Sequence, residues 1–147
     1  MDRPAASVIV PWGPQFIGIT RGTDVGNVCF PGGSGDPQDA GPRVTAVREL
    51  QEETGIVVLA ADLEEILVRP DGGHVTYLAR RIEYAPGVLQ SNPFEGYVDP
   101  YPAQAFLAPS SRYRETAEEA FRRISGAPTT QRNPLQDYER LRRSLLR

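Results

Sequence analysis

Three glutamates lie close together in the segment RELQEETGI, residues 48–56. Glu49, Glu52 and Glu53 are three and four positions apart, so on a helix their carboxylates share one face. Like charges at this spacing destabilise a helix by about a few tenths of a kcal/mol each, and the helix macrodipole disfavours them near the C-terminal end. Local stability alone therefore does not favour the cluster, whereas a divalent cation such as Mg2+, which prefers oxygen ligands, would neutralise it.

A helix over residues 42–54 is predicted to carry this cluster. Pro42 suits the first turn of a helix, where its missing N–H costs little, and Gly55 is a typical C-terminal stop. Apolar residues recur at a spacing of three and predict the face that packs on a sheet. These residues are Val44, Val47 and Leu50.

Short apolar segments and turns predict the elements around this helix. Strands are expected at 6–10, 15–20 and 28–30, before the helix, and apolar stretches follow it at 56–60 and 64–69. The turn PDGG at 70–73 predicts a hairpin whose second strand covers 74–84. Residues 97–109 are expected to be mostly loop with one short strand, 111–124 a second helix, and 135–147 a terminal amphipathic helix.

The 147 residues suit a single domain over 1–147. With Cys29 as the one cysteine, neither an internal disulfide nor a cysteine-based metal site is expected. The start lacks the apolar core of a signal peptide, and no run of 18 apolar residues occurs, so we expect a cytoplasmic protein without a membrane span. All 16 basic residues are Arg, and residues 112–147 carry 9 basic and 5 acidic side chains, which leaves open a basic face for phosphate or nucleic acid.

The segment from Pro31 to Ile56 resembles the Nudix box, which is a glycine, five residues, a glutamate, seven residues and then R-E-U-x-E-E-x-G-U, where U is aliphatic. The second half matches at Arg48, Glu49, Leu50, Glu52, Glu53, Gly55 and Ile56. The first half departs, with Ala40 where the family has glutamate and Ser34 where it has glycine. Counted from Gly33 with a one-residue insertion, Asp39 could take the place of that glutamate.

This resemblance implies an α/β (α+β) fold, an α-β-α sandwich with a mixed β-sheet packed between helices. It also implies a site for Mg2+ or Mn2+ whose protein ligands are Glu49, Glu52, Glu53 and, from a later loop, Glu95. The Gly32-Gly33 turn would line the site, with the Gly32 carbonyl as a further ligand. Arg48 would orient the carboxylates, although an ordinary ion pair with Glu52 fits the same spacing. The expected catalytic residues are Glu52, Glu95 and Arg48.

The implied activity is hydrolysis of the diphosphate linkage in a nucleoside diphosphate derivative, foremost a nucleoside triphosphate. ADP-ribose or a dinucleoside polyphosphate remains an alternative, as do a catalytically weak nucleotide-binding module and RNA cap hydrolysis, although a nucleic-acid partner is less favoured. Relatives are often dimers, which leaves a homodimer open.

Several other side chains are candidates for binding the nucleotide. Those that could hold distal phosphates are Arg21, Arg69 and Arg81. Those that could stack on a base, or equally belong to the core, are Phe16, Tyr77, Phe94 and Tyr97. Structural roles are expected for His74, for Trp12 and for Cys29 as a buried small hydrophobe.

Overall fold

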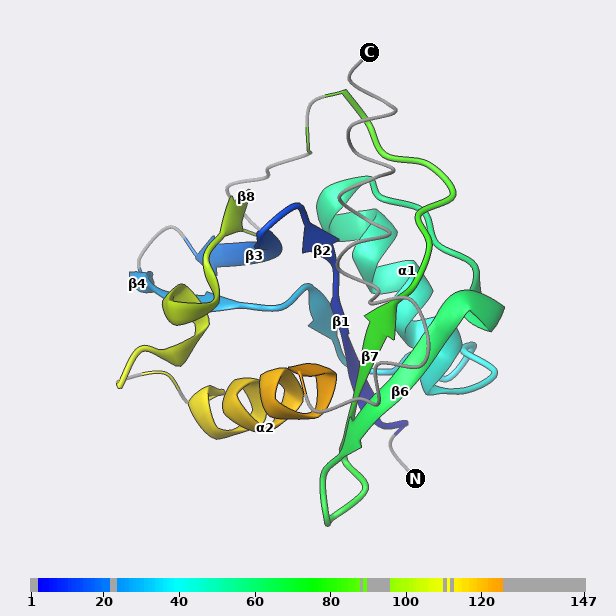
Figure 1. The fold of residues 1–147 in the computed structure, drawn as a ribbon. Helices are drawn as coiled ribbons and strands as arrows, with labels where there is room; N and C mark the ends of the chain where they lie inside the picture. Colours follow the sequence, from blue (N-terminus) through cyan, green and yellow to red (C-terminus); the bar gives the residue numbers. More distant parts are fainter. Residues whose placement is uncertain are drawn as a thin grey trace.

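The computed structural model describes residues 3–21, 24–87, 89, 96–109, 111 and 113–125 (Figure 1). Its first sheet has the strand order β5 (Gly32–Gly33), β1 (Ala5–Ile9), β7 (His74–Ala79) and β6 (Leu63–Val68). β1 and β7 run parallel, whereas β5 pairs with β1 and β6 pairs with β7 in antiparallel fashion. The sheet is therefore mixed, as the resemblance implies.

A second sheet is built around β3 (Gln15–Arg21). β3 pairs with β2 (Pro11–Trp12), with β4 (Asp24–Cys29) and with β8 (Tyr97–Tyr101), in each case antiparallel. A hydrogen bond from the Ile17 N–H to the Val10 carbonyl ties β3 to the end of β1, so the two sheets meet at this corner.

The two α-helices lie on opposite sides of the first sheet, with α1 (Pro42–Thr54) on one side and α2 (Arg114–Ser125) on the other (Figure 1). The alternation of side chains along β1 shows this directly, because neighbouring residues of a strand face opposite ways. Val8 and Val10 pack in one core cluster with Leu50 of α1, whereas Ile9 packs in a second cluster with Ala120 of α2. The α-β-α arrangement is thus confirmed.

Aromatic rings fill the space between α2 and the short 3-10 helix η2 (Ala103–Leu107). Phe106 is 1% exposed and stacks on Phe30, with ring centroids 4.6 Å apart. Phe121 of α2 meets the same two rings edge-on. Such ring pairs stabilise a core beyond their buried area, and here they fix the direction of Phe30 just before the glycines of β5.

Some predicted details are wrong. Of the three residues predicted to pack on the sheet, Leu50 is buried and Val47 packs against the core, but Val44 is 40% exposed. Ala46 and Thr54, four positions on either side of Leu50, are buried instead. Residues 56–60 form no strand beyond one bridge between Val57 and Tyr84, and they lead into the 3-10 helix η1 (Ala60–Asp62). β7 ends at Ala79, and α2 begins three residues later than predicted.

The terminal helix predicted at 135–147 lies outside the described residues. Within the described part of the chain, no helix is both long and apolar enough to cross a membrane.

Candidate functional site

The end of α1 is formed as the sequence predicts. Gly55 adopts a left-handed conformation with φ of 81°, and its N–H donates to the Gln51 carbonyl. The Thr54 hydroxyl donates to the Leu50 carbonyl at 2.7 Å and accepts from the Ile56 N–H at 3.0 Å, so the buried hydroxyl makes both of these bonds within the protein. This rigid end fixes the direction in which the three preceding glutamates leave the helix.

Arg48 lies at the centre of the acidic cluster. Its Nη1 donates to Glu49 Oε1 at 3.1 Å and to Glu52 Oε2 at 3.2 Å, and its Nη2 donates to the Ser34 carbonyl at 3.2 Å. Arg48 therefore makes the expected i,i+4 ion pair with Glu52 and also contacts Glu49 and a loop carbonyl, as a residue that orients the carboxylates would. One guanidinium therefore contacts and orients two of the three glutamates.

Asp39 supplies the strongest anchor for Arg48. Its Oδ1 accepts from Arg48 Nε at 3.2 Å, and its Oδ2 accepts from Arg48 Nη2 at 3.0 Å in a two-point contact. The carboxylate is 4% exposed and also accepts hydrogen bonds from the Thr45 hydroxyl and the Asp36 N–H. These bonds, foremost that from Arg48, hold the pKa of Asp39 far below its ordinary value, and the same pair raises the pKa of Arg48. Asp39 is therefore charged and bound to the arginine of the acidic segment.

Glu53 and Glu49 both contact the glycines of β5. Glu53 Oε1 accepts from the Gly32 N–H at 2.8 Å, which links the last turn of α1 to the edge strand of the first sheet. A Cβ placed on Gly33 would lie 2.5 Å from the Cδ of Glu49, so the carboxylate packs directly on the glycine backbone. The Gly-Gly pair thus allows two carboxylates to lie against the strand.

Oxygen ligands suited to a hard divalent cation are present, but they are not assembled around one point. Among the described residues, no three acidic, histidine or cysteine side chains converge closely enough to hold an ion as they stand. The reason is visible in the contacts, because Arg48 holds Glu49 and Glu52 while Glu53 turns to Gly32. The donor chemistry fits a hard cation, provided that the glutamates rotate away from these partners.

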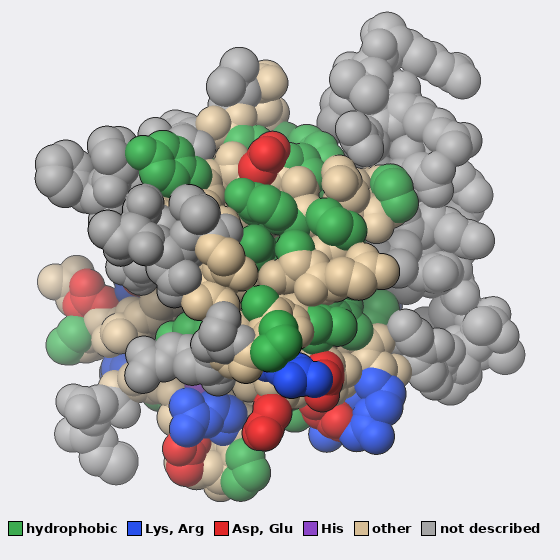
Figure 2. All heavy atoms as spheres, turned by 90° about the vertical axis from the view of Figure 1, so that its left-hand side faces the viewer, with side chains coloured by type: hydrophobic (Ala, Val, Ile, Leu, Met, Phe, Trp, Pro, Cys, Tyr) green, Lys and Arg blue, Asp and Glu red, His purple; other side chains and the backbone are tan. Residues whose placement is uncertain are grey.

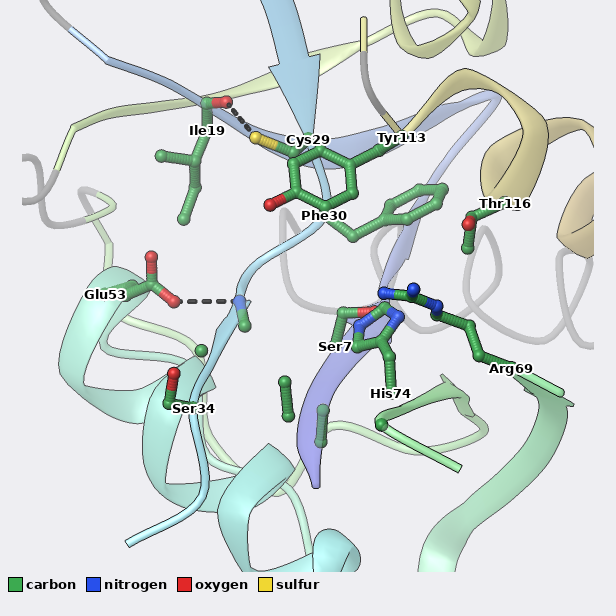
Figure 3. Close-up of a pocket in the computed structure, with 15 residues that line it drawn as sticks. Ser7, Ile19, Cys29, Phe30, Ser34, Glu53, Arg69, His74, Tyr113 and Thr116 are labelled. Atoms are coloured by element: carbon green, nitrogen blue, oxygen red, sulfur yellow. Dashed lines mark hydrogen bonds between the residues drawn. The ribbon is translucent and has the colours of Figure 1, made fainter. Parts of the chain in front are cut away.

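A pocket with a volume of about 340 Å³ opens beside Glu53 (Figure 3). Glu53 and the β5 glycines form one side of it, and Arg69 and His74 lie on the side away from Glu53. Phe30 and Tyr113 also line it. The volume is near the lower end of the range for small-molecule sites, which suits one compact organic group beside the acidic cluster.

Other predicted binding residues fall in different places. Phe16 and Tyr77 are 6% and 1% exposed and belong to the core, so neither can stack on a ligand. Arg69 lines the pocket, whereas Arg81 is exposed and is not part of its lining. Tyr97 is 48% exposed on β8 and lines no part of the pocket either. Glu95, Phe94 and the side chain of Arg21 lie outside the described residues.

The sequence alone does not identify several residues of this pocket. Cys29 is half-buried and lines the pocket, where full burial is expected, and its thiol lies 3.5 Å from the Ile19 carbonyl. His74 begins β7 opposite Ala5 of β1, which is structural as expected, but its side chain also lines the pocket. Trp12 packs against the core from β2, as predicted.

The arginines of α2 do not form an unbalanced basic surface. Arg122 and Arg123 both pair with Glu119, and Arg114 pairs with Glu118 at 3.2 Å. On the face shown in Figure 2, basic and acidic side chains lie side by side near one edge, while hydrophobic groups lie at the centre. Paired charges of this kind give little of the phosphate attraction that nucleic-acid binding requires.

Comparison with solved structures shows the same fold in several proteins. A putative Nudix hydrolase family member from Chromobacterium violaceum has 16% identity and a TM-score of 0.67, with 98% of this chain and 92% of that chain covered. A MutT protein from Bacillus halodurans has 21% identity and a TM-score of 0.55, covering 73% of this chain and 72% of that one. An ADP-ribose pyrophosphatase from Streptococcus suis has 17% identity and a TM-score of 0.60, covering 88% and 94%.

No curated protein sequence matches the chain significantly. The family model described as the NUDIX domain, in contrast, matches residues 1–97, which include both β5 and the whole of α1. Together with the acidic helix end and its pairing with the edge strand, this match shows that the chain belongs to the Nudix family of pyrophosphohydrolases, which in general act on nucleotides with the help of divalent metal ions.

Proposed function

We propose that this protein hydrolyses the diphosphate linkage of a nucleoside diphosphate derivative, and that its preferred substrate is a nucleoside triphosphate, cleaved to a monophosphate and pyrophosphate. Water attacks a phosphorus atom, the bond from that phosphorus to the bridging oxygen breaks, and the proton of the water passes to a carboxylate. A carboxylate serves this purpose when it lies within hydrogen-bond reach of the water. Glu52 and Glu95 are the proposed proton acceptors.

The observation that carries the proposal is the position of Glu53. This residue belongs to the acidic face of α1 and lines the pocket at the same time. A ligand in the pocket would therefore place its phosphates next to Glu49, Glu52 and Glu53. The pocket volume favours one nucleoside over the two of a dinucleoside polyphosphate.

The residues that would hold a divalent cation, for which we propose Mg2+ or Mn2+, are Glu49, Glu52, Glu53 and Glu95, with the Gly32 carbonyl. When bound, the cation polarises phosphoryl oxygens and lowers the pKa of the attacking water. It also reverses the charge of a surface that would otherwise repel a polyphosphate. Arg48, held by Asp39, keeps Glu49 and Glu52 oriented beside it.

ADP-ribose is the second candidate substrate, because a protein of the same fold is an ADP-ribose pyrophosphatase. A catalytically weak binding module is less favoured, since the two-point contact of Asp39 with Arg48 supports a role for Asp39 in place of the missing glutamate. RNA cap hydrolysis is also less favoured, because the arginines of α2 are paired with glutamates. The other arginines on which this alternative depends lie outside the described residues, and they are Arg140, Arg142 and Arg143.

Turnover of nucleoside triphosphates and ADP-ribose with Mg2+ or Mn2+ tests the proposal, with release of phosphate or pyrophosphate as the readout. We expect Glu52→Gln and Glu53→Gln each to abolish metal-dependent turnover while the circular dichroism spectrum stays unchanged. Glu118→Gln, which removes an exposed glutamate paired with Arg114 on α2, is the matched control and should retain full activity. Unchanged turnover in both α1 variants would refute the assignment.

A further inference from the structure

The end of the pocket away from Glu53 is built by the β6–β7 hairpin. The pocket extends across the first sheet, from β5 at one edge to the turn that joins β6 and β7 at the other. With neighbouring strands about 4.8 Å apart, β5 and β6 are separated by three strand spacings, or roughly 14 Å. A ligand with its phosphates at Glu53 therefore presents its opposite end to Arg69 and His74 (Figure 3).

The turn itself holds Arg69 in place. Asp71 Oδ2 accepts from Arg69 Nη2 at 3.0 Å, while Asp71 Oδ1 accepts from the Gly73 N–H at 2.8 Å. The Gly72 N–H donates to the Arg69 carbonyl at 2.8 Å, and Gly72 has a φ of 72°, a conformation that favours glycine. A guanidinium that is half exposed is thus oriented by a side chain of the same turn.

The charges at this end of the pocket cancel. Arg69 contributes one positive charge and Asp71 one negative charge in the same ion pair. Burial lowers the pKa of His74, and the nearby Arg69 lowers it further, so the imidazole is neutral at pH 7. The pairing with Asp71 offsets part of the attraction that Arg69 would offer a phosphate group at this position. The N–H groups of the guanidinium can only donate, so the ligand atom that faces Arg69 must be a hydrogen-bond acceptor, such as a ring carbonyl.

Aromatic side chains also line the pocket. One face of Phe30 is stacked on Phe106, which fixes the ring, and Tyr113 is 46% exposed. A flat heteroaromatic ring can stack on such surfaces, and the stacking energy depends little on which nucleobase it is. Stacking therefore gives affinity without discriminating between bases. Selection among rings must then come from the polar groups at the ring edge.

We infer, on the basis of the proposed function, that Arg69 determines base selection by donating hydrogen bonds to a ring carbonyl, so that the pocket prefers a keto group at C6 of a purine or C4 of a pyrimidine over an amino group at the same position. An amino group at that position would place its N–H groups against those of the guanidinium, so the hydrogen bond that the keto oxygen accepts would be lost. Ser7 adds a hydroxyl at the pocket floor, 3.3 Å from the hydroxyl of Thr76, which can donate or accept and so does not oppose the preference.

Two nucleotide pairs that differ at the relevant group test this inference. ITP is compared with ATP, and UTP with CTP, by measuring kcat/KM for each. Binding of IMP, AMP, UMP and CMP is measured by calorimetry without metal, which makes the selectivity readout independent of turnover. We expect the keto member of each pair to be favoured about 10- to 100-fold, the usual discrimination of a guanidinium that contacts a base edge.

Arg69→Met keeps the length of the side chain and removes its donors, so it should bring both ratios close to one by weakening the keto nucleotides. Arg80→Met is the matched control, because Arg80 is an exposed arginine paired with Glu64 at 2.8 Å beside the same hairpin and outside the pocket lining. It should leave the ratios unchanged.

Four outcomes would overturn the inference: no keto preference in the native protein, an unchanged preference in Arg69→Met, an equal loss for all four nucleotides, or no binding and no turnover of any of them. An equal loss would identify Arg69 as a phosphate ligand. A keto preference in binding without any hydrolysis would instead refute the proposed function and leave the inference standing.

Discussion

Replacing Asp39 tests whether this residue takes the place of the glutamate that the acidic motif lacks. Four hydrogen-bond donors surround its carboxylate, so two substitutions can be chosen that remove different numbers of these bonds. Oδ2 accepts from Arg48 Nη2, from the Thr45 hydroxyl and from the Asp36 N–H, whereas Oδ1 accepts from Arg48 Nε alone. In Asp39→Asn the amide oxygen can keep the three-donor position, but its NH2 group then faces Arg48 Nε. Asp39→Ala removes all four interactions.

Both variants should act through Arg48 on the orientation of Glu49 and Glu52. Loss of a partner that orients metal ligands usually lowers metal affinity or activity by about 10- to 100-fold. We expect Asp39→Asn near the lower figure and Asp39→Ala near the upper one. The measurements are Mg2+ and Mn2+ affinity by calorimetry and kcat at saturating metal. Glu64→Gln, a carboxylate-to-amide change in the exposed pair with Arg80, should alter neither.

A double-mutant cycle with Arg48→Met decides whether the effect passes through Arg48. If Asp39 acts by holding this arginine, Asp39→Asn should cost little in the Arg48→Met background, because the two changes remove the same contact. Strictly additive losses in metal affinity would refute the reasoning, as would an Asp39→Ala variant that binds metal as the native protein does.

Two further results are expected. Gly33→Ala should lower metal affinity with little change in melting temperature, because the three atoms nearest to its Cβ belong to the movable carboxylate of Glu49. Gly32→Ala should lower the melting temperature measurably by circular dichroism, because its Cβ would lie 2.3 Å from the Ala6 carbonyl oxygen, a backbone atom. Because the pKa of Asp39 is lowered in the folded protein, its ionised carboxylate stabilises the fold fully above the ordinary pKa of 3.8 and less as the pH falls below that value. Urea unfolding between pH 5 and about pH 2 should therefore show a shallower loss of stability in Asp39→Asn than in the native protein.

The helix that carries the glutamates was predictable because its signals are local. Pro42 and Gly55 define its ends, and the structure places α1 between them. The face that packs on the sheet was predicted less well, because a spacing of three and a spacing of four both fit short apolar patterns. Leu50 fits both spacings and is buried. Val44 fits only the spacing of three and is exposed, whereas Ala46 fits only the spacing of four and is buried.

Most of the far end of the pocket was not predictable, because its residues are distant in sequence and carry no motif. Arg69 is a candidate from the sequence, but as a phosphate ligand. Ser7 lines the same pocket as His74 and Arg69 because β1 pairs in parallel with β7, which places Ser7 opposite Thr76, 69 residues later in the chain. Asp39 is an intermediate case. Counting residues offered it as a substitute for the missing glutamate, but only the loop geometry shows that its carboxylate reaches Arg48 at two points.

The turn that joins β6 and β7 is supported mainly by its own residues, since Asp71 bonds to Arg69 and to Gly73 within the same few positions. The acidic end of α1 depends on a different set of contacts, with Asp39, Ser34 and Gly32. Insertions or substitutions in the hairpin can therefore accumulate without disturbing the helix. One scaffold can in this way diverge toward new ligands during evolution while its reactive chemistry stays the same.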